Sequence, residues 1–265
     1  MKQLSEQCQH PNVLRAINVV IDVEFRTVYL VMELCSGGEL FHRLARKHVF
    51  TQREAAECIS PIASGLEALH SLGILHLDLK PENLLYETPK DDANVKITDF
   101  GMARWEDDDR VTRRLRGTVG FVAPECVLKR EYRAAADVFS LGVIAFILLM
   151  GYAPFHGADD AEVLSKTAQG DYRIEADDWT AIDPRASELV SAMLQHDPAK
   201  RATVQQVLSN DWLTSDFRHD RGAERRPAHA TEEQRKLSSL LPQRIQSYLA
   251  LRSSMKEPPF KSWMM

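Results

Sequence analysis

The chain has 265 residues, of which 44% are hydrophobic and 27% are charged, values typical of a globular protein with one large domain or two small ones. This composition excludes a chain that is disordered throughout, and the formal net charge of −5 indicates no general attraction to nucleic acid. The 4 cysteines include no CxxC pair, which argues against a zinc site or a disulfide framework and favours a reduced, cytoplasmic location.

Neither a leader nor a membrane span is expected. The first ten residues, "MKQLSEQCQH", are polar and lack the apolar core of a signal peptide. The longest apolar run, "VFSLGVIAFILLM" at 138–150, is shorter than the roughly 20 residues that a bilayer requires. We therefore predict a buried core helix there and no association with a membrane.

The first third of the chain combines strand and helix patterns. The apolar, β-branched segment 28–34, "VYLVMEL", predicts a buried strand, followed by a turn at 36–38 and a short helix at 39–48. "TQRE" at 51–54 is a capping box that opens a helix, and Gly73 ends it. The apolar positions of that helix recur at helical spacing: Ala55, Ile59, Ile62, Leu66 and Leu69.

The remaining elements indicate an α+β protein with a mainly helical body. Two short strands are predicted at 83–86 and 94–98, then a long loop at 99–125. Helical patterns follow at 134–150, 159–168, 185–195 and 203–209. Residues 214–230 are polar and predict a flexible linker, and 231–265 return to an amphipathic pattern.

Four polar motifs occur in a fixed order: "HLDLKPEN" (76–83), "TDFG" (98–101), "GTVGFVAPE" (117–125) and "DPAKRAT" (197–203). Taken singly, each has a structural explanation, because Asp78 or Asp99 could cap a turn and Glu125 could lie on a helix face. Together, the first three resemble the catalytic loop, the magnesium loop and the end of the activation segment of the protein kinase family. The resemblance runs from about residue 4 to residue 213.

This resemblance implies a kinase fold with a small lobe and hinge remnant at 1–35 and a complete large lobe at 36–213. It also implies phosphoryl transfer from ATP with Mg²⁺, in which positioning and charge neutralisation do most of the catalysis. Asp78 would orient the acceptor hydroxyl, and Lys80 would bring positive charge to the phosphoryl group. Asn83 and Asp99 would supply oxygen ligands to Mg²⁺.

The same resemblance assigns further roles. "DLKPEN" together with Thr118, which would hydrogen-bond Asp78 and Lys80, favours a serine/threonine kinase; the alternative for Thr118 is a local turn cap. Met32 would be the gatekeeper of the ATP site. The residues that would contact the nucleotide beside it are Glu33 and Cys35 through their backbone, Leu85 under the adenine ring, and Glu39. Glu39 and Glu82 would also bind a basic residue upstream of the phosphorylated Ser or Thr.

Some residues are implied to be structural. His76 would pack near Phe100, Asp137 would hold the backbone of the catalytic loop, and Glu125 would pair with Arg201. For His76 this role matches the ordinary expectation for a buried, hydrogen-bonded histidine.

The subgroup signals are "HPNVL", "SGGELF" and "DLKPENLLY", which are similar to the calcium/calmodulin-dependent kinase group. The tail 241–256, "LPQRIQSYLALRSSMK", resembles the autoinhibitory junction of calcium-dependent protein kinases. Its apolar face with basic flanks suits a segment that docks in a groove or is bound by calmodulin. The alternative is an ordinary amphipathic helix on the body. No calcium-binding EF-hand loop is present in the sequence.

Two departures from the family pattern stand out. Leu77 occupies the position of an arginine that pairs with a phosphorylated activation loop, so we do not expect phosphorylation of that loop to be the switch. No glycine-rich loop and no "VAIK"-type lysine precede residue 28, so an N-terminally truncated small lobe with an uncovered strand edge is expected. The alternative function is therefore a catalytically impaired, pseudokinase-like fragment that acts as a binding module.

Overall fold

The computed structural model describes residues 8–47, 50–107, 115–172, 179 and 182–215. The chain divides into two compact units, residues 1–228 and 229–265, and every described residue belongs to the first. The predicted tail at 231–265 and the predicted linker from residue 216 onward lie outside the described residues.

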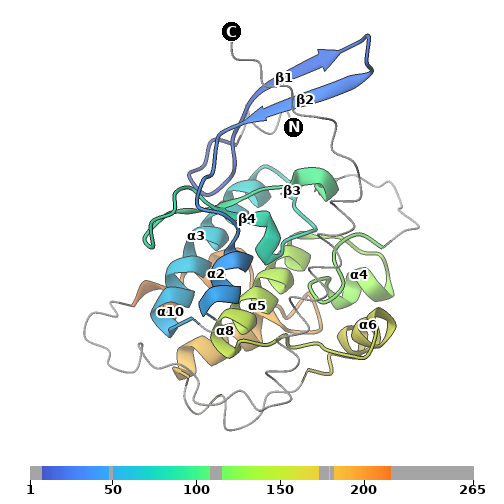
Figure 1. The fold of residues 1–265 in the computed structure, drawn as a ribbon. Helices are drawn as coiled ribbons and strands as arrows, with labels where there is room; N and C mark the ends of the chain where they lie inside the picture. The colour runs from blue at the N-terminus through green and yellow to red at the C-terminus, as the bar shows by residue number, and fades with distance from the viewer. Residues whose placement is uncertain (1–7, 48–49, 108–114, 173–178, 180–181, 216–265) are drawn as a thin grey trace. The chain divides into compact units, whose positions relative to one another are not determined.

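The first sheet is a two-stranded hairpin of β1 (Ala16–Asp22) and β2 (Thr27–Met32), drawn in blue in Figure 1. The strands are antiparallel, with Asp22 opposite Thr27 next to the turn and a register shift between Ala16 and Asn18. β2 confirms a strand within the predicted range 28–34, but the prediction that it is buried is wrong, because in a two-stranded hairpin no further element covers its faces among the described residues. β1 was not predicted. Many apolar side chains of the hairpin are exposed: Ile17, Val20, Ile21, Val23, Phe25, Val28, Tyr29, Val31 and Met32.

Two helices follow the hairpin. α2 spans Leu40–Lys47, and α3 spans Gln52–Ser71. The capping box is confirmed, because the Thr51 side chain accepts from the backbone N–H of Glu54 and the Glu54 side chain accepts from that of Thr51. α3 continues through Pro61, although proline removes a helical hydrogen bond. Gly73, with φ of +70°, turns the chain just past the end of the helix.

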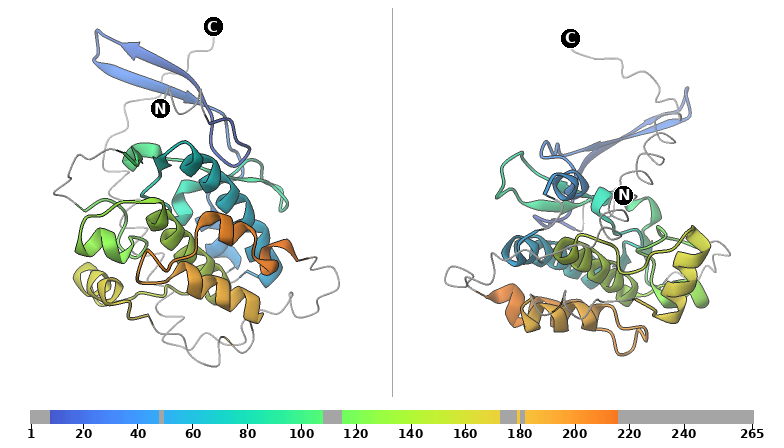
Figure 2. Two further views of the ribbon diagram at one scale, coloured as in Figure 1. Left: turned by 180° about the vertical axis from the view of Figure 1, so that it is seen from behind. Right: turned by 60° about the horizontal axis from the view of Figure 1, so that its bottom comes forward.

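The helical body is built around α5 (Ala134–Met150), in which every residue from Ala136 to Met150 is buried. α3 packs against α5 and α9 (Val204–Leu208), while α8 (Pro184–Met193) packs against α5 (Figures 1 and 2). α4 (Pro124–Leu128), α6 (Asp160–Gln169) and α10 (Asp211–Thr214) complete it. The four helices predicted between 134 and 209 are confirmed within one or two residues at each end, and none of the described helices is long and apolar enough to cross a membrane.

Short strands lie between the hairpin and the helices. β3 (Ile74–Leu75) pairs with β6 (Arg104–Trp105), and β4 (Leu84–Tyr86) pairs with β5 (Val95–Ile97). Two 3-10 turns, η1 (Pro81–Asn83) and η2 (Phe100–Met102), join these strands to their loops. The α+β prediction is confirmed, and the two ladders bring the polar stretch 76–83 beside the loop at 98–101.

Candidate functional site

The loop after β3 is held by one buried aspartate. Asp137, in the first turn of α5, accepts backbone hydrogen bonds from His76 (2.8 Å) and from Leu77 (2.7 Å). Leu77 has φ of +63°, a left-handed conformation that costs about 1–2 kcal/mol in a residue with a side chain. The two bonds to Asp137 offset this strain, so the predicted role of Asp137 in holding the loop is confirmed.

Asp137 receives a third hydrogen bond, from His70 at the end of α3, with 2.9 Å between His70 Nε2 and Asp137 Oδ2. Burial of Asp137 disfavours the charged form, but the hydrogen bond and electrostatic attraction of His70, together with the electrostatic contribution of His76 and the hydrogen bond from its backbone N–H, outweigh burial and hold the pKa of Asp137 below its usual value. The carboxylate is therefore the form that the fold stabilises.

His76 is structural, as predicted. Its Nε2 donates to the carbonyl oxygen of Thr98 (2.9 Å), and its Nδ1 accepts the backbone N–H of Asp78 (3.3 Å). The ring also contacts Phe100, with 5.3 Å between the two ring centroids. Both ring nitrogens are thus used to join the loop at 76–78 to the loop at 98–100, and neither is left for proton transfer.

Asp78, Lys80 and Thr118 form a closed set of polar contacts. Thr118 Oγ1 donates to Asp78 Oδ1 (2.6 Å) and accepts from Lys80 Nζ (3.0 Å). Lys80 Nζ also lies 3.0 Å from Asp78 Oδ2. The predicted hydrogen bonds of Thr118 are confirmed, and they join the loop that carries Asp78 and Lys80 to the separate loop that carries Thr118.

Asn83 and Asp99 are brought together by the backbone. Asn83 Nδ2 donates to the backbone oxygen of Asp78 (2.7 Å) and lies 3.3 Å from its Oδ2. Its amide nitrogen is therefore taken, which leaves the side-chain oxygen for a hard cation. The carbonyl of Asn83 accepts from Thr98 N (2.9 Å), and the next residue, Asp99, is exposed with φ of +59°. An amide oxygen and a carboxylate suit Mg²⁺.

Glu82 and Glu39 form an acidic pair beside this cluster. One carboxylate oxygen of Glu82, Oε2, is buried and has no hydrogen-bond partner among the described residues. Burial raises the pKa of Glu82; the charges of Glu39 and Asp78 raise it further, although Lys80 and a backbone hydrogen bond oppose the rise. The backbone of Glu39 pairs with that of Leu85. A cationic side chain entering here would satisfy a buried acceptor.

Except for Leu85, the predicted nucleotide residues lie where β2 leads into α2. Met32 ends β2 and is 42% exposed. The backbone N–H of Glu33 donates to the carbonyl of Arg15 (3.0 Å), so its own carbonyl is the group that could accept from a base. Cys35 is half-buried, and its pKa is raised by burial and by the charge of Glu33. Leu85 is in β4 and is half-buried.

The segment that carries Thr118 is anchored by a buried ion pair. Arg201 donates to both carboxylate oxygens of Glu125, with distances of 2.7 and 2.9 Å. Arg201 also donates to the carbonyl of Ala135 at the start of α5 (2.8 Å). The predicted pair is confirmed, and its two-pronged geometry holds α4 against α5.

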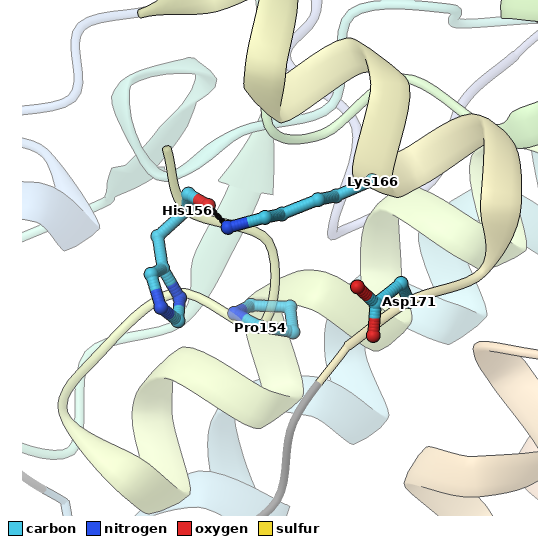
Figure 3. A pocket seen from close by; sticks show the side chains of 4 residues that line it. All are labelled: Pro154, His156, Lys166 and Asp171. Carbon is cyan, nitrogen blue, oxygen red and sulfur yellow. Dashed lines mark hydrogen bonds between the residues drawn. The ribbon is translucent and has the colours of Figure 1, made fainter. Parts of the chain in front are cut away.

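A small pocket of about 190 Å³ lies elsewhere, between the loop after α5 and α6, and is lined by Pro154, His156, Lys166 and Asp171 (Figure 3). Lys166 Nζ donates to the carbonyl of His156 (2.8 Å) and pairs with Glu162 (2.9 Å). Its charge is therefore already compensated, and none of the predicted site residues lines this pocket.

Residues 2–213 match the sequence profile of the protein kinase domain. The chain belongs to the protein kinase family. This kinase domain is 37% identical over 206 residues to a calcium/calmodulin-dependent protein kinase type 1 from Macrobrachium nipponense, covering 78% of the chain and 59% of that relative. It is 41% identical over 216 residues to calcium-dependent protein kinase 12 from Arabidopsis thaliana, covering 82% and 43%. The human calcium/calmodulin-dependent protein kinase type 1B is 38% identical over 212 residues, covering 80% and 61%.

The chain spans about half of the length of these curated relatives.

Two residues next to the site were not identified from the sequence. His70 is an ordinary helical histidine in sequence, and Lys96 has the residue type of an exposed strand position, yet both are hydrogen-bonded or ion-paired next to the site. Only their tertiary partners, Asp137 and Glu33, reveal them.

Proposed function

We propose that this chain acts as a serine/threonine protein kinase, transferring the γ-phosphoryl group of ATP to a Ser or Thr hydroxyl of a protein substrate. The observation that carries the proposal is the closed contact of Asp78, Lys80 and Thr118, with Asn83 bonded to the same aspartate. Phosphoryl transfer requires a positioned acceptor and compensated charge rather than a covalent intermediate, and this set supplies both.

Asp78 is proposed to orient the acceptor hydroxyl and to take its proton at a carboxylate oxygen. Thr118 and Lys80 hold the two oxygens of Asp78 in place at 2.6 and 3.0 Å, so the carboxylate needs no reorganisation when the hydroxyl arrives. The ammonium of Lys80 would be shared between Asp78 and the transferred group, which lowers the electrostatic cost of bringing anionic phosphate near a carboxylate.

Asn83 and Asp99 are proposed to hold Mg²⁺ through their side-chain oxygens. When bound, Mg²⁺ and ATP supply the transferable phosphoryl group and much of the charge neutralisation. The backbone of Glu33 and Cys35 is proposed to bind the adenine edge. Met32 would lie behind the ring and Leu85 beneath it.

We propose that Glu39 and Glu82 bind the side chain of an arginine or lysine that lies three residues upstream of the acceptor residue in the substrate. Glu82 Oε2 supports this, because a guanidinium would donate to an acceptor that has no partner in the described part of the chain. Since burial raises the pKa of Glu82, binding of the arginine favours the ionised form, and the preference for arginine should weaken as the pH is lowered.

Leu77 supports a switch other than activation-loop phosphorylation. Its side chain is buried and apolar, so it offers no cation to a phosphate.

We propose instead that regulation acts through a calcium sensor such as calmodulin that contacts residues 241–256, in line with the names of the curated relatives. A Ca²⁺-dependent change in the fluorescence of Trp263 on addition of calmodulin would support this, and no change at micromolar calmodulin would contradict it. A cytoplasmic location stays a prediction from the cysteine pattern.

The proposed function is tested by phosphate transfer from Mg-ATP to two serine peptides that differ only in an arginine or a glutamine three residues upstream. Wild type should phosphorylate the arginine peptide faster, Glu82→Gln should reduce that preference, and Asp78→Asn should abolish most transfer to both. Mg-ATP should also raise the melting temperature of the wild type by ligand linkage. If millimolar Mg-ATP causes no thermal shift and no phosphate is transferred to either peptide, the kinase proposal fails and the pseudokinase-like binding module is left as the function.

A further inference from the structure

Lys96 is a buried lysine next to the proposed nucleotide site. It lies in β5 opposite Leu85, and only 6% of its surface is exposed. Its ammonium lies 3.2 Å from Glu33 Oε1, with 8% of the lysine side chain and 23% of the glutamate side chain exposed. Burying an ammonium is costly unless it is paired, so Glu33 is an integral partner of Lys96.

The carboxylate of Glu33 joins three segments of the chain. Besides the contact with Lys96, its Oε1 accepts the backbone N–H of Arg15 (2.8 Å) just before β1. The backbone N–H of Glu33 in turn donates to the carbonyl of Arg15 (3.0 Å). The start of β1, the residue after β2, and β5 therefore meet at one side chain.

The stretch from Glu33 to Gly37, which we call the hinge, is anchored at its two ends in different ways. At the far end, the backbone N–H groups of Ser36 and Gly37 donate to the carbonyls of Glu87 (3.0 Å) and Tyr86 (2.9 Å). At the near end, the described contact with β5 is the ion pair of Lys96 with Glu33. Between the anchors, Leu34 is 86% exposed. The position of the hinge over β4 thus depends on a backbone anchor and on a charge anchor.

The ammonium of Lys96 also acts electrostatically on the Cys35 thiol in the hinge. Burial and the charge of Glu33 raise the pKa of the Cys35 thiol, and the charge of Lys96 opposes that rise. Lys96 is therefore within electrostatic reach of both residues whose backbone is proposed to bind adenine. Three residues further along the chain is Asp99, the proposed metal ligand.

We propose that Lys96 is a positioning residue of the nucleotide site, which holds the hinge at a fixed distance from the β4–β5 ladder by pairing with Glu33. The inference rests on the proposed function, because it takes the hinge as the adenine-binding segment. Removing one partner of a pair destabilises the fold strongly only when the other charge stays buried, and the Glu33 side chain is 23% exposed and can be solvated. The effect of losing Lys96 is therefore expected in nucleotide affinity more than in global unfolding.

The test uses the full chain and Mg-ADP as the probe, titrated by calorimetry into wild type, K96M, K96R and E33Q. K96M removes the charge and keeps the length of the side chain, and it should weaken Mg-ADP binding about tenfold, roughly 1.4 kcal/mol. K96R keeps a cation within reach of Glu33 and should recover most of that loss. K47M, which breaks the Lys47–Glu54 pair on the helical body, is the matched control and should bind as wild type does.

Two further measurements separate positioning from a general structural effect. In turnover, K96M should raise the KM for ATP about tenfold while kcat changes less than about twofold, and the double variant K96M/E33Q should be no weaker than K96M. Without nucleotide, backbone amides at 33–36 should exchange faster in K96M than in wild type, with no change in α3.

Wild-type affinity of K96M for Mg-ADP would overturn the proposal, and so would an additive loss in K96M/E33Q. If the wild type binds no Mg-ADP, the proposed function fails rather than the anchoring role. Hydrogen exchange then decides: faster exchange at 33–36 in K96M supports the anchor, and unchanged exchange overturns it. E33Q provides the same test should K96M not fold.

Discussion

The helical body and the β1–β2 hairpin contain the same kinds of apolar side chain, but they bury them to opposite degrees. In the body, Ile62 and Leu66 of α3 are 0% exposed. In the hairpin, Ile21 is 68% exposed and Val28 63%. A helix that packs its apolar stripe on other helices is stable by that contact, whereas a two-stranded hairpin is marginal by itself.

Both faces of the hairpin are apolar. Ile21 and Val28 are opposite each other on one face, and Val20 and Tyr29 are opposite on the other. Apolar residues on both faces are typical of strands that are covered on both sides. Among the described residues, the hairpin joins the rest of the protein near its base, through Leu14 N to the carbonyl of Ile97 (2.9 Å) and through Glu33 to Lys96. The polar groups of the body are therefore held by many contacts, whereas the hairpin that leads into the proposed nucleotide-binding segment is held by few.

The largest effect is expected from Asp78→Asn in the body. Loss of the proposed proton acceptor should lower kcat by about 10²- to 10⁴-fold, while Mg-ADP binding changes little, because the nucleotide contacts are proposed to lie in the hinge. Ile21→Ala in the hairpin is the control and should leave kcat unchanged. If Asp78→Asn changes only the KM for ATP, the division of roles between the two regions is wrong.

The next largest effect is expected from Arg201→Met. Removing one partner of the buried pair leaves the Glu125 carboxylate without compensation, at a cost of about 3–5 kcal/mol in the free energy of unfolding. Arg53→Met is the control. Arg53 Nε lies 3.0 Å from Glu57 Oε1, a distance similar to that of the buried pair, but the two side chains are 40% and 62% exposed. Its loss should therefore lower the free energy of unfolding by about 1 kcal/mol or less. Urea unfolding of both variants measures the difference, and equal losses would contradict the assigned burial.

A matched pair of isoleucines tests the comparison directly. Ile62→Ala should lower the free energy of unfolding by about 2–5 kcal/mol, because it leaves a cavity in the packed core. Ile21→Ala should cost less than about 0.5 kcal/mol, as an exposed substitution does. A cost for Ile21→Ala that approaches that of Ile62→Ala would show that the hairpin face is covered in solution.

A smaller effect, dependent on pH, is expected from Asp137→Asn. Because the folded-state pKa of Asp137 is below its unfolded value, its contribution to stability is full above the unfolded pKa of about 3.9. That contribution is lost as the pH falls through the lower, folded-state pKa. The stability difference between wild type and Asp137→Asn should therefore be constant above about pH 5 and shrink in more acidic solution. A constant difference down to the acid transition would mean that His70 and the backbone do not stabilise the charged form.

The elements that could be predicted are those whose signals are local. The predicted helix at 134–150 matches α5 residue for residue. A long, continuous apolar run that begins with alanines and ends before Gly151 favours a buried helix over any other local structure. The capping box at Thr51 depends on residues only three apart. The order and spacing of the polar motifs likewise identified the residues that meet at the site, since the resemblance depends on sequence alone.

Other features could not be predicted because their cause is distant in sequence. β3 and β6 are two residues each and exist only through their mutual pairing. β1 has apolar residues but no clean alternation, so its partner β2 defines it. The left-handed conformation of Leu77 depends on Asp137, sixty residues away in α5.

By itself, then, the sequence determined which groups are available for the proposed phosphoryl transfer and which helices form the body, because residue type, capping and periodicity act over a few residues. The tertiary structure decided which of those groups are oriented, paired or unsatisfied. Asp78 is held by Thr118, which is 40 residues away, and Glu82 Oε2 is buried without a partner among the described residues. Burial and charge pairing depend on what lies nearby in space, and in this chain the deciding neighbours are far apart in sequence.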